Sequence, residues 1–437
     1  MTSTLTSTLT STQLTSTHFT LIFLIAVGLS LMLHIWLAMR QLRHVATHRS
    51  AVPKEFAGRI ELAEHHKAAD YTCAKARLSI VSLLIGTAML LAFTSGGLLQ
   101  RIAEQCANTF PEAGYLYGLS LIGAVIFISF LIDLPLDLYR TFVLEARFGF
   151  NKLTLPLYLA DLVKQGALAI LIGAPLLLAI LWVMNQMGNL WWLYAWLFWM
   201  TFNLLALLLY PTLIAPLFNK FVPLDNAELK ARIEALLTRC GFRSSGLFVM
   251  DGSKRSSHGN AYFTGFGAAK RIVFYDTLLE RLTPPEIDAV LAHELGHYRH
   301  RHVWKRIALL GMLTLLFFAA LGVLMGQDWF YAGLGVTPPT LMTPGTTALA
   351  LLLFFLVLPS FTFLLSPLMS QLSRRHEYEA DAYAASQTAA NDLINALVKL
   401  YRDNAATLTP DPLHSLFHDT HPPAGLRIAH LKSLPTR

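Results

Sequence analysis

Long apolar runs alternate with polar segments along this chain. Each run is about twenty residues or longer and could cross a bilayer as a helix. We predict such spans at 19–39, 78–99, 115–139, 166–184, 190–217, 307–325 and 347–365. The third run carries Asp133 and Asp137 near its end. Carboxylates are costly in lipid, so we expect both to face protein or water. The pattern predicts a mainly α polytopic membrane protein with seven spans.

Composition and charge agree with this prediction. The chain has 437 residues, of which 54% are hydrophobic and 14% are charged, whereas soluble proteins have about 25% charged residues. With the amino terminus outside, the inner segments are 40–77, 140–165, 218–306 and 366–437, and they hold 33 of the 34 Lys and Arg residues. Positive charge concentrates on the inner side of membrane proteins. The net charge of +7 is therefore explained by topology, and the bilayer is expected as a partner while nucleic acid is not.

The polar segments also divide the chain. Residues 1–18 form a Thr, Ser and Leu leader without Lys or Arg, which we expect to be disordered and which lacks the basic start of a signal peptide. The first five spans and their loops occupy 19–217, spans six and seven occupy 307–365, and the carboxyl-terminal inner segment is 366–437. The remaining segment, 218–306, is the largest break in hydrophobicity. At the outer span ends, we expect four interfacial aromatics, namely Trp191, Trp192, Trp329 and Tyr331.

The segment 218–306 reads as a small α+β domain. A helix at 226–237 is followed by strand-like runs at 246–250, 261–267 and 271–276. Thr283 and Glu286 then form a capping box around two prolines and predict the start of a helix. Because Pro and Gly are absent between Gly296 and Gly311, we expect this helix to run on into the sixth span. Gly296 within it costs about 1 kcal/mol against alanine, which a close neighbour would explain.

Candidate chemistry lies on this helix as His293-Glu-Leu-Gly-His297. Histidines four residues apart project from one helical face and can share a Zn²⁺ at about 2.1 Å each. Glu294 lies about 100° round the helix. It can take a proton from a water in the open coordination position. The alternative is a chance pentapeptide in a chain with 16 histidines.

An acidic pair follows the last span. Glu377 and Asp381 are four residues apart in a good helix-forming stretch and share a face. Glu377 could complete a two-histidine, one-carboxylate zinc site, and Asp381 could orient a ligand imidazole. A solvated acidic face is the alternative interpretation. The three cysteines, Cys73, Cys106 and Cys240, are far apart in sequence and indicate neither a disulfide framework nor a cysteine zinc site.

With these residues in view, the chain resembles the type I CAAX prenyl protease family of integral-membrane zinc metalloproteases. The resemblance extends from the first span to Arg427. The motifs that carry it are Glu145-Ala-Arg-Phe-Gly-Phe-Asn-Lys152, Asn260-Ala-Tyr-Phe-Thr-Gly265, His293-Glu-Leu-Gly-His297, Glu377-Tyr-Glu-Ala-Asp381 and His421-Pro-Pro with Arg427. It implies one Zn²⁺ held by His293, His297 and Glu377, and it implies spans around a water-filled chamber with the site near the inner face.

The resemblance also implies roles for other residues. Glu294 is the expected general base, Asp381 is expected to support a ligand, and His421 and Arg427 are expected to stabilise the oxyanion. Without the resemblance, His421 and Arg427 would read as a surface loop and a solvated arginine. A substrate backbone could pair with a strand formed by Asn260, Ala261, Tyr262, Thr264 and Gly265, which could equally be an ordinary edge strand.

Two other functions remain open at this point. A membrane quality-control protease of the heat-shock type shares the histidine motif but has fewer spans. A metal transporter should carry ionisable residues at mid-bilayer in several spans, and here the span centres are almost free of them. A peptide or protein substrate, possibly prenylated, is expected. The sequence does not indicate an oligomeric state. The lean loops and the lack of a terminal retrieval signal favour a bacterial inner membrane over the endoplasmic reticulum, with the catalytic site on the cytoplasmic side.

Overall fold

The computed structural model describes residues 15–110, 114–264, 270–341 and 343–435. Within these ranges, seven helical runs are long and apolar enough to cross a membrane, which confirms the predicted number of spans. The seven runs are Ser16–Thr47, Leu62–Phe93, Tyr115–Glu145, Leu155–Gln186, Gly188–Phe218, His302–Leu324 and Pro344–Gln387. Most of these helical runs are longer than the predicted apolar stretches, because each helix continues into flanking polar residues. Of the predicted leader, residues 1–14 lie outside the described ranges, and the first helix begins at Ser16.

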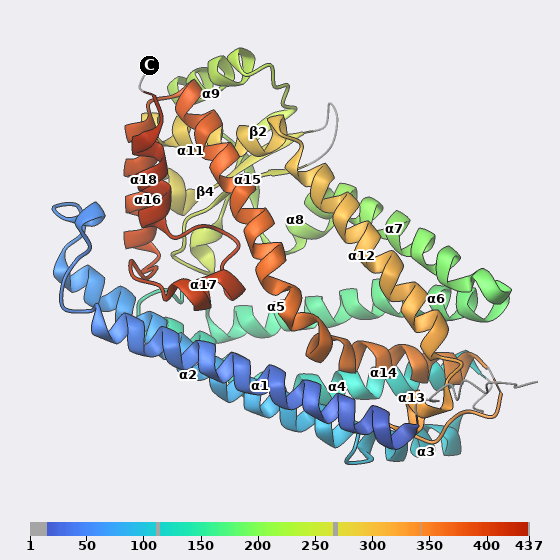
Figure 1. Cartoon of the computed structure of the whole chain (residues 1–437). Coiled ribbons are helices and arrows are strands. Elements are labelled where there is room, and N and C mark those ends of the chain that lie inside the picture. Colours follow the sequence, from blue (N-terminus) through green and yellow to red (C-terminus); the bar gives the residue numbers. More distant parts are fainter. Residues whose placement is uncertain (1–14, 111–113, 265–269, 342, 436–437) are drawn as a thin grey trace, which may run out of the picture.

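The membrane part is built from long helices with short connections (Figure 1). Its helices are α1 (Ser16–Thr47), α2 (Leu62–Phe93), α3 (Leu98–Thr109), α4 (Tyr115–Tyr139), α5 (Leu155–Leu168), α6 (Ala174–Gln186), α7 (Trp191–Leu209), α8 (Ala215–Phe218), α12 (His302–Leu324), α13 (Asp328–Ala332) and α14 (Pro344–Thr362). Three spans contain a π-helical turn, at Arg140–Glu145, Ala169–Gly173 and Tyr210–Ile214. The turns at Ala169–Gly173 and Tyr210–Ile214 each join the helix before them to the one after without breaking the span, whereas the turn at Arg140–Glu145 ends its span.

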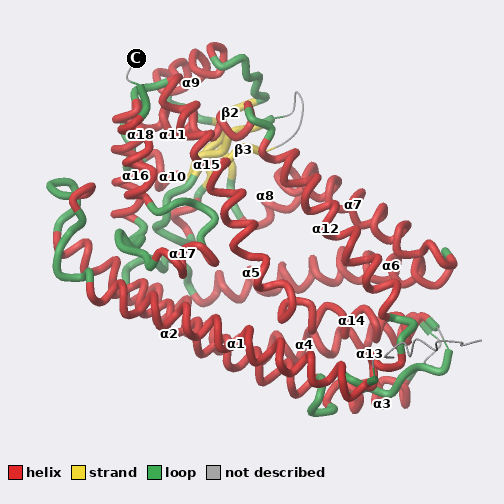
Figure 2. The backbone as a smooth tube through the Cα atoms, viewed as in Figure 1, coloured by secondary structure: helices red, strands yellow, loops and turns green. Residues whose placement is uncertain are grey.

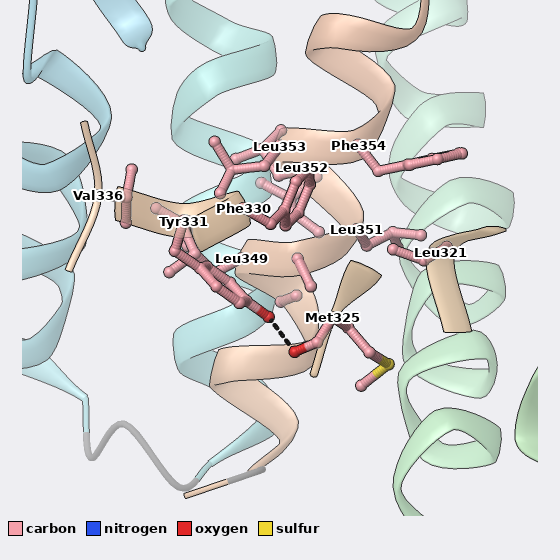
Figure 3. Packing of buried hydrophobic residues seen from close by; sticks show 14 of the residues in the cluster. Leu321, Met325, Phe330, Tyr331, Val336, Leu349, Leu351, Leu352, Leu353 and Phe354 are labelled. Carbon is pink, nitrogen blue, oxygen red and sulfur yellow. Dashed lines mark hydrogen bonds between the residues drawn. The ribbon is translucent and has the colours of Figure 1, made fainter. Parts of the chain in front are cut away.

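The largest buried core of the membrane part includes the short helix α13 at the end of α12 (Figure 3). Tyr331 on α13 is 1% exposed, and its hydroxyl donates a hydrogen bond of 2.8 Å to the Met325 carbonyl. Phe330 beside it is fully buried. The expectation that Tyr331 is an interfacial aromatic is therefore wrong. Its hydroxyl finds a partner inside the protein, so it can pack in the core instead of facing the headgroups.

The catalytic part is a small α+β unit, in which all the strands gather beside α11 and α15 (Figure 2). Its elements are β1 (Phe221–Pro223), α9 (Ala227–Arg239), β2 (Gly246–Met250), β3 (Ala261–Thr264), β4 (Arg271–Tyr275), α10 (Asp276–Leu279), α11 (Pro284–Arg299), α15 (Ser366–Gln387), α16 (Ala390–Asp403), α17 (Pro412–His418) and α18 (Ala424–Ser433). The strand order is β1-β2-β4-β3, with β2 and β4 parallel and the other pairs antiparallel. Strand β3 therefore lies at an edge of the sheet.

The predicted continuity of the histidine helix with the sixth span is wrong. Helix α11 ends at Arg299, and α12 begins at His302. Between them, Arg301 has a left-handed backbone with φ of 55°, a conformation that stops an α-helix. The absence of Pro and Gly did not predict this, because a non-glycine residue can adopt the left-handed conformation when tertiary contacts on both sides hold it.

Continuity with the membrane is found instead on the acidic helix. Helix α14 passes through a short 3₁₀ turn at Phe363–Leu365 into α15, and the whole run spans Pro344–Gln387. In Figure 1, α15 crosses from the membrane helices to the catalytic part and ends beside α11. The element that enters the catalytic part directly from lipid therefore carries Glu377 and Asp381.

Candidate metal centre

Helices α11 and α15 approach each other unusually closely at Gly296. A Cβ placed on this residue would lie 2.8 Å from the Ala380 Cα and 3.0 Å from its carbonyl oxygen. A side chain cannot be accommodated at such distances, which is the close neighbour expected from the glycine's cost in mid-helix. The contact lies between the pairs His293 and His297 on one helix and Glu377 and Asp381 on the other. The close contact therefore brings the histidine pair of α11 opposite the acidic pair of α15, and in each pair the residues are four positions apart.

Helix α11 is held in place by its capping box and by its apolar face, both of which the sequence predicts. Thr283 and Glu286 form the capping box, in which the Thr283 amide donates a hydrogen bond of 2.7 Å to Glu286 Oε2. Lys399 Nζ on α16 lies 2.7 Å from the same oxygen. The apolar side of the helix packs in the catalytic core through Ile287, Leu291 and Leu295. The histidines are thus carried by a helix that is fixed at its start and along one side.

Three ligand atoms converge on one point between the helices. His293 Nε2 and His297 Nε2 are 3.3 Å apart, and they lie 3.5 Å and 3.3 Å from the nearer oxygens of Glu377. His293, His297 and Glu377 are the one group among the described residues whose ligand atoms are arranged to hold a metal ion. His293 and Glu377 are buried, at 7% and 4% exposure. The geometry is that of one face of a coordination polyhedron.

The group fits zinc. Ligands about 2.1 Å from a tetrahedral Zn²⁺ lie about 3.4 Å from one another, which is close to the 3.3 Å between the two Nε2 atoms, to the 3.5 Å from His293 to Glu377 Oε2 and to the 3.3 Å from His297 to Glu377 Oε1. Glu377 Oε2 is buried without a hydrogen-bond partner among the described residues, a costly arrangement that a cation would relieve. Two imidazoles with one carboxylate leave a fourth position for water, as in catalytic zinc sites.

His293 is supported through its second ring nitrogen. His293 Nδ1 lies 2.9 Å from Asp381 Oδ1, and Arg427 donates hydrogen bonds of 2.8 Å and 2.6 Å to the two oxygens of Asp381. Asp381 is fully buried, and Arg427 is 6% exposed. Burial alone would lower the pKa of the His293 ring, but the carboxylates of Asp381 and Glu377 raise it to about 9. Metal binding at neutral pH must therefore displace a proton from this ring.

His297 is supported by residues that the sequence analysis missed. Its Nδ1 lies 3.0 Å from His302 Nδ1, and His302 Nε2 lies 3.0 Å from Glu379 Oε2. His302 directly follows the break at Arg301, and Glu379 lies between Glu377 and Asp381 on α15. A histidine five positions after the motif was visible in the sequence. The continuous helix we predicted would have turned its side chain away.

Glu294 is positioned differently from its neighbours. It is half-buried, and its carboxylate has neither a hydrogen bond nor an ion pair within the described ranges. A carboxylate in such a position can accept a proton from a water molecule beside the metal face. The role expected for Glu294 as the general base stays a prediction.

The carboxyl-terminal residues reach the site from α17 and α18. His421 Nε2 lies 3.3 Å from Glu377 Oε1, and its side chain is 63% exposed. Arg427 uses Nε and Nη2 for Asp381, whereas its Nη1 lies 3.5 Å from Glu377 Oε2. Burial alone would lower the pKa of Arg427, but the hydrogen bonds to Asp381 raise it further above its ordinary value. Both residues thus lie within contact of the metal-binding group, and neither is a free surface residue.

A further residue that the sequence analysis missed holds the loop before His421. Arg374, one turn before Glu377 on α15, donates a hydrogen bond of 3.1 Å to the Asp419 carbonyl. It also donates to the Ser415 carbonyl and, at 2.8 Å, to the Ser415 hydroxyl. The same helix therefore carries the third candidate ligand and anchors the loop that brings His421 to it.

The predicted substrate strand forms β3, next to α11. Ala261 and Tyr262 pair with Phe274 and Val273 of β4, and the opposite edge of β3 pairs with none of the described strands. The Asn260 side chain accepts a hydrogen bond of 2.8 Å from the Ala261 amide. The backbone of Thr264 ends the strand, and Gly265 lies outside the described residues. An edge strand next to the histidine helix has main-chain groups available for an added strand.

The acidic residues of the third span line a cavity, as expected. Asp133, Asp137 and Arg140 face a cavity of about 460 Å³, and the Tyr158 hydroxyl donates a hydrogen bond of 2.8 Å to Asp137 Oδ2. Neither carboxylate has to be placed in hydrocarbon.

Comparisons with known proteins agree with this geometry. The family model described as CAAX prenyl protease N-terminal, five membrane helices, matches residues 41–220, and that of peptidase family M48 matches residues 223–434. CAAX prenyl protease 1 of Saccharomyces cerevisiae is 36% identical over 387 residues, covering 84% of this chain and 85% of the relative. Its homolog in Arabidopsis thaliana is 34% identical and covers 91% and 94%.

A solved structure is also similar. The crystal structure of Saccharomyces mikatae Ste24p superposes with a TM-score of 0.88 at 34% identity, covering 94% of this chain and 99% of that one. The first family model describes the five-helix membrane part of the CAAX type. The comparisons therefore favour this type over a heat-shock quality-control protease and over a metal transporter.

Proposed function

Since the chain belongs to the CAAX prenyl protease family of M48 zinc metallopeptidases, and is thus a membrane-embedded zinc metalloendopeptidase of the CAAX-processing type, we propose which residues perform the reaction. His293, His297 and Glu377 hold the zinc ion. Asp381 orients His293. The observation that carries this assignment is the cluster between α11 and α15, in which the two Nε2 atoms lie 3.3 Å apart and each lies 3.3–3.5 Å from one oxygen of the Glu377 carboxylate.

Glu294 is the general base in this proposal. A zinc ion held by His293, His297 and Glu377 would act as a Lewis acid, which would lower the pKa of a bound water towards about 7 and polarise the scissile carbonyl. A carboxylate oxygen of Glu294 takes the proton as the water attacks, and it returns the proton to the leaving amide nitrogen. The lack of competing partners for Glu294 among the described residues supports this role.

His421 and Arg427 are proposed to stabilise the oxyanion. Nε and Nη2 of Arg427 are engaged by Asp381, so the donor directed at the site is Nη1, 3.5 Å from Glu377 Oε2. The exposed ring of His421 offers a second donor beside the same carboxylate. A hydrogen-bond donor aimed at a developing oxyanion stabilises the transition state by about 3–4 kcal/mol.

We propose that the substrate binds as an added strand on β3. Asn260, Ala261, Tyr262 and Thr264 lie along the edge, and Gly265 follows them. Main-chain pairing holds an extended peptide and tolerates varied side chains. The names of the relatives mention CAAX prenyl proteases, so the proposed substrates are prenylated proteins that lose a carboxyl-terminal tripeptide.

The proposed organisation follows the predicted segments. Residues 19–217 and 307–365 form the membrane part, and 218–306 with 366–437 form the catalytic part. We propose that the spans surround a water-filled chamber, as the resemblance implies, and the cavity of about 460 Å³ lined by Asp133, Asp137 and Arg140 supports this proposal. The clustering of Lys and Arg supports a catalytic part on the cytoplasmic side. The lean loops favour a bacterial inner membrane, whereas the eukaryotic relatives favour the endoplasmic reticulum.

A peptidase assay with Glu294→Gln tests these roles. The variant, reconstituted in lipid, should bind zinc as the parent does and lose about 10²–10⁴-fold in turnover of a farnesylated CAAX peptide. Glu280→Gln, an exposed glutamate on the same domain, is the control and should keep full activity. Parental turnover by Glu294→Gln would remove this residue from the mechanism. Equal cleavage of the same peptide without its farnesyl group would contradict the proposed substrate class.

A further inference from the structure

The supports of the two histidines differ in the described structure. His293 Nδ1 meets a carboxylate directly, at 2.9 Å from Asp381. His297 Nδ1 meets another imidazole, that of His302, at 3.0 Å, and a carboxylate follows only beyond it, where His302 Nε2 lies 3.0 Å from Glu379 Oε2. His302 is 4% exposed. A buried imidazole thus connects a candidate metal ligand to an acidic side chain near the surface.

We propose that Glu379 and His302 form a positioning chain that fixes His297 in the tautomer that binds zinc; this inference rests on the proposed metal site. Neutral imidazole carries one proton, on either Nδ1 or Nε2. Two arrangements of protons are compatible with the contact between the rings. In one, His297 Nδ1–H donates to His302 Nδ1. In the other, His302 Nδ1–H donates to His297 Nδ1.

Glu379 selects between these arrangements. Its carboxylate can only accept, so His302 must place its proton on Nε2 and donate it to Glu379 Oε2. His302 Nδ1 then has a lone pair and accepts the proton of His297 Nδ1. The lone pair of His297 is left on Nε2, the atom that faces His293 and Glu377. The opposite arrangement would protonate His297 Nε2 and block it as a ligand.

Neighbouring side chains hold the Glu379 carboxylate in place. Arg375 Nε donates a hydrogen bond of 3.1 Å to Glu379 Oε1, and Lys305 Nζ lies 4.0 Å from Oε2. His302 is also fixed from its face, because the buried His376 ring stacks on it with the centroids 4.0 Å apart. The second imidazole is therefore held in both its position and its hydrogen-bond direction.

The break between α11 and α12 makes the chain possible. In an uninterrupted helix, a residue five positions on lies about 140° round the axis and about 7.5 Å further along it, so His302 could not reach His297. The left-handed Arg301 redirects the backbone and brings His302 back under the ring. The left-handed backbone at Arg301 thus allows the contact between His302 and His297 at the metal site.

Zinc affinity tests the chain independently of activity. Removing the hydrogen-bond partner of a ligand histidine lowers the metal affinity about 10–100-fold. We expect His302→Ala to weaken zinc binding by about that factor in competition with a chromophoric chelator, and Glu379→Gln to weaken it in the same direction. His302→Asn should recover part of the loss, because its amide oxygen can accept from His297 Nδ1–H. The absorption bands of the Co²⁺-loaded protein should shift in His302→Ala.

The matched control is Glu280→Gln, at an exposed glutamate of the same domain that takes no part in the chain. It should bind zinc as the parent does. His302→Ala and Glu379→Gln with parental zinc affinity would overturn the chain, provided His293→Ala still loses zinc. Parental affinity in His293→Ala would instead overturn the metal site itself. If His302→Ala does not fold, Glu379→Gln, at a partly exposed position, decides the question alone.

Discussion

The two helices that form the candidate metal centre are held in opposite ways. Helix α11 is bounded at both ends, by the Thr283 capping box and by the left-handed Arg301, and it belongs to the α+β core. Helix α15 continues from α14 out of the membrane. One helix supplies the imidazoles, and the other supplies the carboxylates. The site therefore exists only where α11 meets α15, the inner end of a helical run that begins in the membrane part, so metal binding is coupled to the packing of these two helices.

Removing the ligand on the membrane-derived helix should have the largest effect. Structural zinc sites gain about 10–16 kcal/mol on binding, so one ligand among four contributes about 3 kcal/mol, or more than a hundredfold in affinity. We expect Glu377→Gln to lose zinc and peptidase activity together, as measured by metal content after dialysis and by peptide cleavage. His297→Gln, on the other helix, should match it. If Glu377→Gln kept stoichiometric zinc after dialysis, α15 would not complete the site.

Breaking the support behind His293 should have the next largest effect. Asp381→Asn keeps an acceptor for the ring but removes the charge that pairs with the buried Arg427. An unpaired buried charge costs about 3–5 kcal/mol, so thermal unfolding should occur at a clearly lower temperature, and zinc affinity should fall about tenfold.

The double variant Asp381→Asn with Arg427→Met separates these two effects. It removes the unpaired guanidinium and should regain much of the stability, but it should not regain the zinc affinity. Recovery of both would mean that Asp381 acts only by neutralising Arg427, and that it does not orient His293.

The comparison between the helices also explains what could be predicted from the sequence. The number of spans, the capping box and the histidine pair depend on composition or on residues within one helical turn, and these signals are local. Whether Glu377 and Asp381 formed a solvated face or faced the histidines depended on a contact between α11 and α15 across about eighty residues. The glycine at position 296, in the middle of a predicted helix, was the one local sequence signal of that contact.

The missed residues have a physical reason in common. His302 and Arg374 contribute through turns and loops, at the break after α11 and on the loop before His421. A left-handed arginine has no strong sequence signal, because its conformation is set by the contacts on either side of it. The continuous helix predicted over this region followed from the absence of Pro and Gly, which is necessary for continuity but does not guarantee it.

Separating the two helices without touching a ligand should have a smaller effect. Gly296→Ala places a methyl group within 2.8 Å of the Ala380 backbone, which should cost about 1–3 kcal/mol in overpacking against a gain of about 1 kcal/mol in helix propensity. We expect net destabilisation in thermal unfolding and weaker zinc binding. The control is Gly425→Ala on α18, where the nearest atom is 4.0 Å away, and it should be neutral or stabilising. If Gly296→Ala had the same stability and zinc affinity as Gly425→Ala, then α11 and α15 could move apart without cost.

The smallest expected effect concerns the start of α11, and it depends on pH. Burial alone would raise the pKa of Glu286, but the ion pair with Lys399 and the hydrogen bond from the Thr283 amide lower it below its ordinary 4.5. The ionised group is therefore favoured by folding, so its stabilisation is present above about pH 4.5 and disappears as the pH falls through the lowered pKa. Glu286→Gln should lose about 1 kcal/mol of stability at pH 7 and nothing once the parent is protonated. Lys399→Met should show the same pH dependence, whereas Glu280→Gln should show none. A loss that stayed constant from pH 7 to pH 3 would show that the shape of the side chain, and not its charge, holds this end of the histidine helix.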